Sequence, residues 1–180
     1  MSGADSPARE CVAEWPTDAL SAISGLEIGP TGKVDYREEV HHPALSLPEV
    51  ARGTLGVTAD GHLLKDQHRP RREISEIGDA FISVRQTPDG PVNLLPIPAE
   101  FRPMLDAMRL VVTGDAKGVA DEFAADLLPD GPGWHIRLLP TDQAAPEMQI
   151  GLIGCGNVLQ VIEIEQAGGV RRVLTLERQQ

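Results

Sequence analysis

The sequence is poor in aromatic residues, which make up 3% of its 180 residues. A surface that stacks nucleic-acid bases or sugar rings needs several aromatic side chains, so a site of that kind is not expected. Positive charge is also scarce, with 16 Lys and Arg against 27 Asp and Glu and a net charge of −11. This excess of negative charge disfavours nucleic acids and anionic membrane surfaces as partners.

The chain contains only two cysteines, Cys11 and Cys155. Two thiolates are too few to form a cysteine metal site by themselves. We expect Cys11 in a helix and Cys155 in a tight turn between strands, and neither position gives a reason for the two to be close. The sequence therefore favours free thiols, with a disulfide as the alternative.

Long hydrophobic runs are missing as well. No run of 18 apolar residues occurs, so no membrane-spanning helix is expected. Residues 1–10 lack the basic segment and apolar segment of a secretion signal, and residues 1–7 are expected to be disordered. A chain of 180 residues can bury a hydrophobic core unaided, so we expect one domain over residues 1–180.

The clearest pattern that is present lies in residues 99–113, AEFRPMLDAMRLVVT. Its apolar residues recur with the spacing of one helical face: Phe101, Met104, Leu105, Met108, Val111 and Val112. Pro98 suits the first turn of a helix, and Gly114 suits the position just after the last turn. The sequence therefore predicts a helix with an apolar stripe that must be buried against another element.

Strands are predicted on both sides of this helix, because apolar and polar residues alternate there with a period of two. In the first of them, Val34, Tyr36, Glu38 and Val40 share one face. Asp60-Gly61 is the strongest hairpin signal. The expected strands cover residues 33–40, 52–58, 62–68, 71–77, 79–86, 92–97, 133–139, 147–153, 158–165 and 172–177.

Two further helices are predicted, at residues 8–23 and 115–128. Pro16 should bend or break the first, and Asp115 should cap the second. A loop with a Gly29-Pro30 turn should follow the first helix. This order of elements predicts an α+β protein, mainly β, in which a curved antiparallel sheet carries helices on its concave side. Such a sheet either packs solid or leaves an apolar cavity.

Residues that could carry chemistry are few. His41, His42, His62 and His68 lie in or beside loops without metal-ligand spacing, so solvated histidines are favoured over a metal site. Cys155 stands between two glycines with no His or Asp at a recognisable spacing, which favours a turn over a nucleophile. The basic run at residues 69–72 is more typical of a solvated strand end than of a contact with a partner or lipid headgroup. We therefore expect no enzyme, metal or cofactor.

Several short motifs resemble those of the LolA-like lipoprotein-carrier family. From Tyr36 to Ile74, an aromatic-x-Glu strand is followed by a Gly-x-Leu strand, a turn, a Leu-rich strand and a Pro-x-x-Glu step. The corresponding residues are Tyr36–Glu38, Gly53–Leu55, Leu63-Leu64 and Pro70–Glu73. Residues 108–123 and 133–142 resemble the helix pair and the Gly-Trp strand of a LolA-like subgroup. In order and spacing, these motifs span about residues 20–176.

The resemblance implies an incomplete antiparallel β-barrel with a helical lid, which carries acylated lipoproteins across the periplasm in an apolar hollow. The sequence departs from the family in having Ala59-Asp60 where well-studied carriers have Arg-Pro, and in its few aromatics. A carrier of lipid or glycolipid is therefore as plausible as a lipoprotein shuttle. A protein-interaction or sensor module with the same fold is the alternative.

On this interpretation, the protein is a periplasmic monomer whose leader is missing from the printed chain. Its partners would be the acylated cargo, an inner-membrane donor and an outer-membrane acceptor. The expected cavity lining combines strand and helix residues: Leu55, Val57, Ile82, Val84, Met104, Leu105, Met108, Ile136, Leu138, Ile150 and Ile162.

Overall fold

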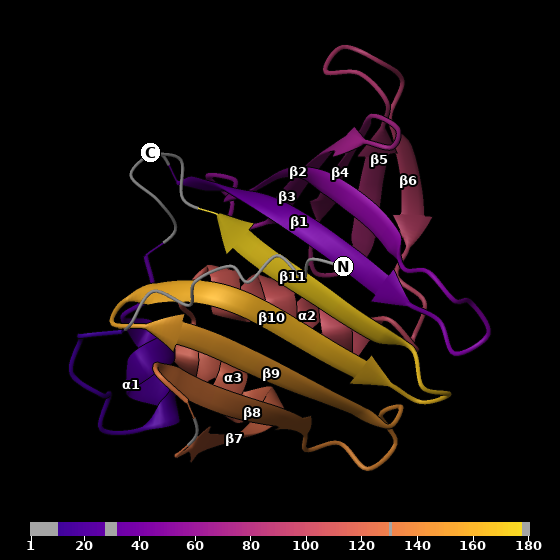
Figure 1. The fold of residues 1–180 in the computed structure, drawn as a ribbon. Coiled ribbons are helices and arrows are strands. Elements are labelled where there is room, and N and C mark those ends of the chain that lie inside the picture. Colours follow the sequence, from indigo (N-terminus) through magenta and orange to yellow (C-terminus); the bar gives the residue numbers. More distant parts are fainter. Residues whose placement is uncertain (1–10, 28–31, 130, 178–180) are drawn as a thin grey trace, which may run out of the picture.

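The computed structural model describes residues 11–27, 32–129 and 131–177, which form three helices and a single sheet of eleven strands. Every neighbouring pair of strands is antiparallel, and the sheet curls without closing (Figure 1). The predicted fold, an incomplete barrel of mainly β structure with helices on its concave face, is confirmed. The expected disorder of residues 1–7 and the Gly29-Pro30 turn lie outside the described residues.

The sheet is built from two runs of sequential hairpins joined in its middle. The first run comprises β1 (Lys33–His41), β2 (Glu49–Val57), β3 (Leu63–Arg69), β4 (Glu73–Ile77), β5 (Phe81–Arg85) and β6 (Asn93–Pro96). The second comprises β7 (Phe123–Leu128), β8 (Trp134–Pro140), β9 (Met148–Cys155), β10 (Val158–Gln166) and β11 (Arg171–Glu177). Pairing of β1 with β11 joins the runs, so β6 and β7 form the two edges.

The central helix α2 (Arg102–Val112) fills the concave side as the sequence predicts. In Figure 1 it is seen between β11 and β10, with α3 (Ala116–Glu122) beside it at β9 and α1 (Ala19–Ser24) next to α3. Its apolar stripe is buried together with the inward face of the strands. Gly114 ends α2 with a φ of +69°, and the amides of Gly114 and Asp115 bond back to Val111 and Leu110. Pro98 precedes the helix, and Pro103 occupies its first turn instead.

Two predicted helices differ from the structure. The expected helix at 115–128 ends at Glu122, and Phe123–Leu128 forms β7, in which Phe123 is buried and pairs with β8. Asp115 does cap α3, accepting a hydrogen bond from the Gly118 amide at 2.9 Å. The expected helix at 8–23 is helical only from Ala19, after the Asp18 cap, because Pro16 lacks the amide hydrogen that a helix needs. Its first residues, 8–10, lie outside the described part.

The prediction of free thiols is wrong, because Cys11 and Cys155 form a disulfide across 144 residues of sequence, with their Cα atoms 5.6 Å apart. The N-terminal segment runs beside the turn between β9 and β10, and the Glu27 amide bonds the Asn157 carbonyl of that turn at 2.9 Å. This contact between distant segments arises from the topology, and no local sequence pattern predicts it. No helix in the described residues has the length and apolar character to span a bilayer.

The α2 stripe is expected to dominate stability. Leu105 is 9% exposed within the core, whereas Leu94 on the edge strand β6 is 68% exposed. We expect Leu105→Glu to lower the free energy of unfolding by several kcal/mol, since it buries a carboxylate in an apolar interior. Leu94→Glu is the matched control and should change it by less than about 0.5 kcal/mol. Urea titration checks this, and equal midpoints for the two variants would refute the packing described for α2.

The disulfide gives a second expectation. Thiol titration of the denatured, unreduced chain should find no free thiol, and Cys11→Ser/Cys155→Ser should lower the free energy of unfolding by about 2–5 kcal/mol. Two titratable thiols per chain would contradict the bond.

Candidate functional site

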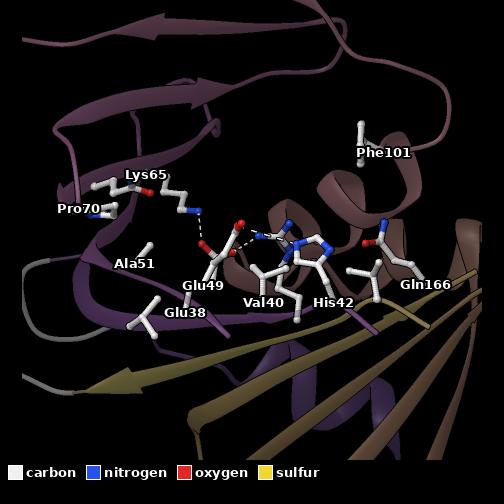
Figure 2. Close-up of a pocket in the computed structure, with 13 residues that line it drawn as sticks. Glu38, Val40, His42, Glu49, Ala51, Lys65, Pro70, Phe101 and Gln166 are labelled. Carbon is white, nitrogen blue, oxygen red and sulfur yellow. Dashed lines mark hydrogen bonds and ion pairs between the residues drawn. The ribbon is translucent and has the colours of Figure 1, made fainter. Parts of the chain in front are cut away.

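A pocket of about 780 Å³ lies at one end of the concave face. At this end the β1–β2 hairpin, the β3–β4 turn and the β10–β11 turn come together, and Phe101 at the start of α2 faces them across the hollow (Figure 2). The pocket has apolar and polar lining residues. The apolar ones are Val40, Val50, Ala51, Pro70, Phe101 and Val170, and the polar ones are Glu38, His42, Glu49, Lys65, Gln67, Gln166 and Arg172.

Apolar side chains stand at the rim. Val50 is 39% exposed and Phe101 40% exposed, so each borders the pocket and also faces solvent. Phe101, Gln166 and Val170 also line a second hollow of about 290 Å³, which continues beside the first. An open pocket with an apolar rim favours entry of an apolar group from solvent or from a partner surface.

The floor of the pocket carries three charged side chains, the buried Glu38 and the partly buried Lys65 and Arg172, which we call the charge cluster. Glu38 is 4% exposed, and its Oε2 accepts a hydrogen bond from the Lys65 Nζ at 2.7 Å (Figure 2). Its Oε1 accepts one from Arg172 Nη1. Burial would raise the pKa of the Glu38 carboxyl, but Lys65 and Arg172 outweigh that effect and hold the pKa below its usual value.

The strands bring these three side chains together for a simple geometric reason. Glu38 on β1 lies diagonally from Arg172 on β11, because Val40 is the residue paired with Arg172. Toward β3, Glu38 must reach across β2, whose inward residues here are the small Ala51 and Gly53. A Cβ on Gly53 would lie 2.0 Å from the Asp66 carbonyl oxygen, so glycine also lets β3 approach β2 closely. Small residues on β2 thus open the space in which the charge cluster forms.

Two polar atoms near the charge cluster have no hydrogen-bond partner among the described residues, the Tyr36 hydroxyl and Arg172 Nε. Tyr36 is 2% exposed, and the Lys65 Nζ stands 5.2 Å from the centre of its ring. Burial, together with the negative charge of Glu38, raises the pKa of Tyr36 well above its usual range, so it stays a neutral donor. The cluster therefore holds unused hydrogen-bond donors as well as charge.

The predicted cavity residues lie elsewhere on the same concave face. Eight belong to the closed core beneath α2: Leu55, Met104, Leu105, Met108, Ile136, Leu138, Ile150 and Ile162. Val57 and Ile82 are partly buried and pack against this core, and Val84 is partly buried on β5. None of the eleven lines the 780 Å³ pocket. The structure thus gathers them around α2, while an open pocket forms nearer the ends of the strands.

Sequence reasoning missed the charge cluster, although one signal was present. Glu38 occupies an inward position of its strand, on the face shared with Val34, Tyr36 and Val40. A carboxylate at such a position needs a buried cation, and that requirement could have prompted a search for one. Lys65 and Arg172 give no comparable signal, because both lie in strands rich in charged residues.

The four histidines considered as metal ligands do not form a cluster. His41, His42, His62 and His68 each lie within 4 Å of a different carboxylate, those of Glu39, Glu49, Glu76 and Asp66 respectively. Within the described ranges, no group of three His, Cys, Asp or Glu side chains is placed to hold a metal ion.

Because the folded state lowers the pKa of Glu38, its ionised form stabilises the fold at neutral pH, and this contribution is lost as the pH falls through the lowered pKa. We expect Glu38→Gln to be less stable than the parent at about pH 7, with a difference that shrinks as the pH falls from about 4, where an unfolded glutamate is protonated, through the lowered pKa of the folded state. Chemical denaturation across this range measures it, with the exposed Glu177→Gln as control. A constant difference down to about pH 2 would show that the carboxylate charge is not responsible.

No protein-family model matches the chain, and no curated protein matches it in sequence. Among solved structures, it is similar to a LolA superfamily protein from Nitrosomonas europaea, with 12% identity and a TM-score of 0.46, covering 92% of this chain and 95% of the other. It is similar to an outer membrane lipoprotein-sorting protein domain from Vibrio parahaemolyticus, with 11% identity, a TM-score of 0.45 and 88% of each chain covered.

LprF from Mycobacterium bovis is similar as well, with 12% identity and a TM-score of 0.38, over 89% of this chain and 88% of that one. The names of two of these neighbours refer to the same LolA-like class that the sequence motifs resemble. At these identities and TM-scores, the comparisons give no evidence of function. The function has to be argued from the site itself.

Proposed function

We propose that this protein is a non-enzymatic carrier that shelters the acyl chains of a lipoprotein, a lipid or a glycolipid. The observation that carries the proposal is the open pocket of about 780 Å³ at the end of a half-barrel, with Val50 and Phe101 exposed at its rim. A pocket of this size is within the range that encloses one small-molecule-sized group. Moving an acyl chain from water into it gains about 0.8 kcal/mol for each methylene buried.

Longer chains would extend from the pocket into the space beneath α2. The side of α2 facing the sheet includes Met104, Leu105 and Met108, and methionine adapts easily to flexible apolar guests. In the proposal, a small shift of α2 exposes the predicted lining to the chain, from Leu55 and Val57 on β2 to Ile162 on β10. A partner that stabilises the closed form would release the cargo.

The disulfide between Cys11 and Cys155 supports a location outside the cytoplasm, because such bonds persist in oxidising compartments. We propose that the carrier works in the periplasm as a monomer. It would take cargo from an inner-membrane donor and pass it to an outer-membrane acceptor.

An exposed apolar edge favours one alternative, a protein-interaction module. Among the strands that the structure describes, β6 has no neighbour on its outer side, and Val92, Leu94 and Leu95 beside or within it are 52%, 68% and 49% exposed. An unpaired apolar edge can add a strand from another protein. This module would need no lipid.

Binding of acyl chains of increasing length separates the two functions. Competition of a fluorescent fatty acid by saturated chains should tighten by up to about fourfold per added methylene until the space is full, from the transfer value of ~0.8 kcal/mol. Ala51→Trp, which fills the pocket, should weaken binding of every chain, whereas Val92→Trp at the far edge is the matched control. A flat response to chain length in the parent protein would reject the carrier and favour the interaction module.

A further inference from the structure

We propose that the charge cluster binds the head of a single-chain amphiphile that carries one negative charge, with the chain held against the apolar residues of the same pocket. This inference rests on the proposed function and adds to it the chemical class of the ligand. It follows from the charge of the cluster, from its unused donors and from its position at the floor of an apolar hollow.

The charge cluster holds one surplus positive charge. Lys65 and Arg172 contribute two positive charges and Glu38 one negative charge, with side chains that are 20%, 23% and 5% exposed respectively. Glu49 is the other carboxylate of the pocket, but it is 70% exposed at the mouth, 3.9 Å from the His42 Nε2, where water screens it. Lys65 and Arg172 are partly exposed to the pocket, so a monoanionic head that enters it can pair with the surplus positive charge.

Donors are available to hold such a head. Glu38 occupies one donor of the Lys65 ammonium, which has three, and the Nη1 of the Arg172 guanidinium. The Arg172 Nε is fully buried, so the remaining donors of the Lys65 ammonium and of the outer guanidinium nitrogens of Arg172 would hold the head. Guanidinium and ammonium groups together suit a carboxylate or a phosphate oxygen, and hydrogen bonds between charged groups are the stronger kind.

The apolar lining fixes the direction of the tail. Val40 pairs with Arg172 across β1 and β11, and Val50, Phe101 and Val170 line the same pocket toward its mouth. A head bound to Lys65 and Arg172 therefore places the first methylenes against apolar side chains. Glu38 is a positioning residue, because it holds both cations at the floor and sets the net charge that the head meets.

The test compares dodecanoate with dodecan-1-ol, which has the same chain and no charge, by isothermal titration calorimetry below the aggregation concentration of each. The parent protein should bind dodecanoate about tenfold more tightly, in line with the strength of charge-assisted hydrogen bonds. Lys65→Met should remove most of this preference, because it should weaken dodecanoate binding far more than dodecan-1-ol binding. Glu38→Gln, which raises the surplus charge, should increase the preference.

Arg171→Met is the matched control, since Arg171 precedes Arg172, pairs with Glu163 at 3.1 Å and does not line the pocket. Its preference should equal that of the parent. If Lys65→Met does not fold, Glu38→Gln/Lys65→Met removes one charge of each sign, keeps Arg172 and should retain the preference. Acetate should not compete, because its carboxylate lacks the chain that fills the pocket.

The outcomes are distinct. Equal affinities for dodecanoate and dodecan-1-ol in the parent, or a preference unchanged in Lys65→Met, would overturn the proposed head site while leaving the carrier intact. Acetate binding as tightly as dodecanoate would also overturn it, in favour of a site for small anions. Failure of both dodecanoate and dodecan-1-ol to bind would reject the carrier itself.

Discussion

The burial of one apolar helical stripe against the inner face of a curved sheet determines the rest of this structure. Helix α2 has seven buried residues in eleven, and the strands around it turn their own apolar residues toward it. A single short helix covers only part of so wide a sheet. The strand ends that the helix does not cover therefore border an open hollow. The function proposed here depends on this hollow.

The hollow combines two physical features that seldom occur together in a protein core. Its rim includes the exposed apolar side chains of Val50 and Phe101, whereas its floor carries Glu38 between Lys65 and Arg172. Replacing such a cluster by apolar residues would often cost a protein nothing in stability. Its presence in a pocket is therefore better explained by a ligand with a polar head and an apolar chain than by stability alone.

Sequence patterns were sufficient to predict the elements in which the spacing of neighbouring residues determines which side chains are buried. The alternation in β1 and the helical spacing in α2 follow directly from which side each residue faces, and Gly114 ends the helix as expected. The strand β7 was missed because Phe123 and Leu127 also have helical spacing after the Asp115 cap. In such a short segment, pairing with β8 outweighed the local preference for a helix.

Features that depend on contacts between distant segments could not be predicted from sequence patterns. Cys11 meets Cys155 only because the N-terminal segment returns to the β9–β10 turn. Likewise, Glu38 and Lys65 are neighbours only because small residues on β2 let their side chains meet above it. The sequence pattern accounts for the burial of most of the predicted cavity residues, but none of them lines the open pocket at the strand ends.

The central claim is that this half-barrel takes up an acyl chain, and native mass spectrometry tests it most directly. The purified full-length chain, incubated with a mixed extract of fatty acids and phospholipids and then separated from free lipid, is measured intact. The account predicts one retained lipid per chain, enriched in molecules with a single acyl chain and a negative head. A spectrum showing only the mass of the bare chain would contradict it.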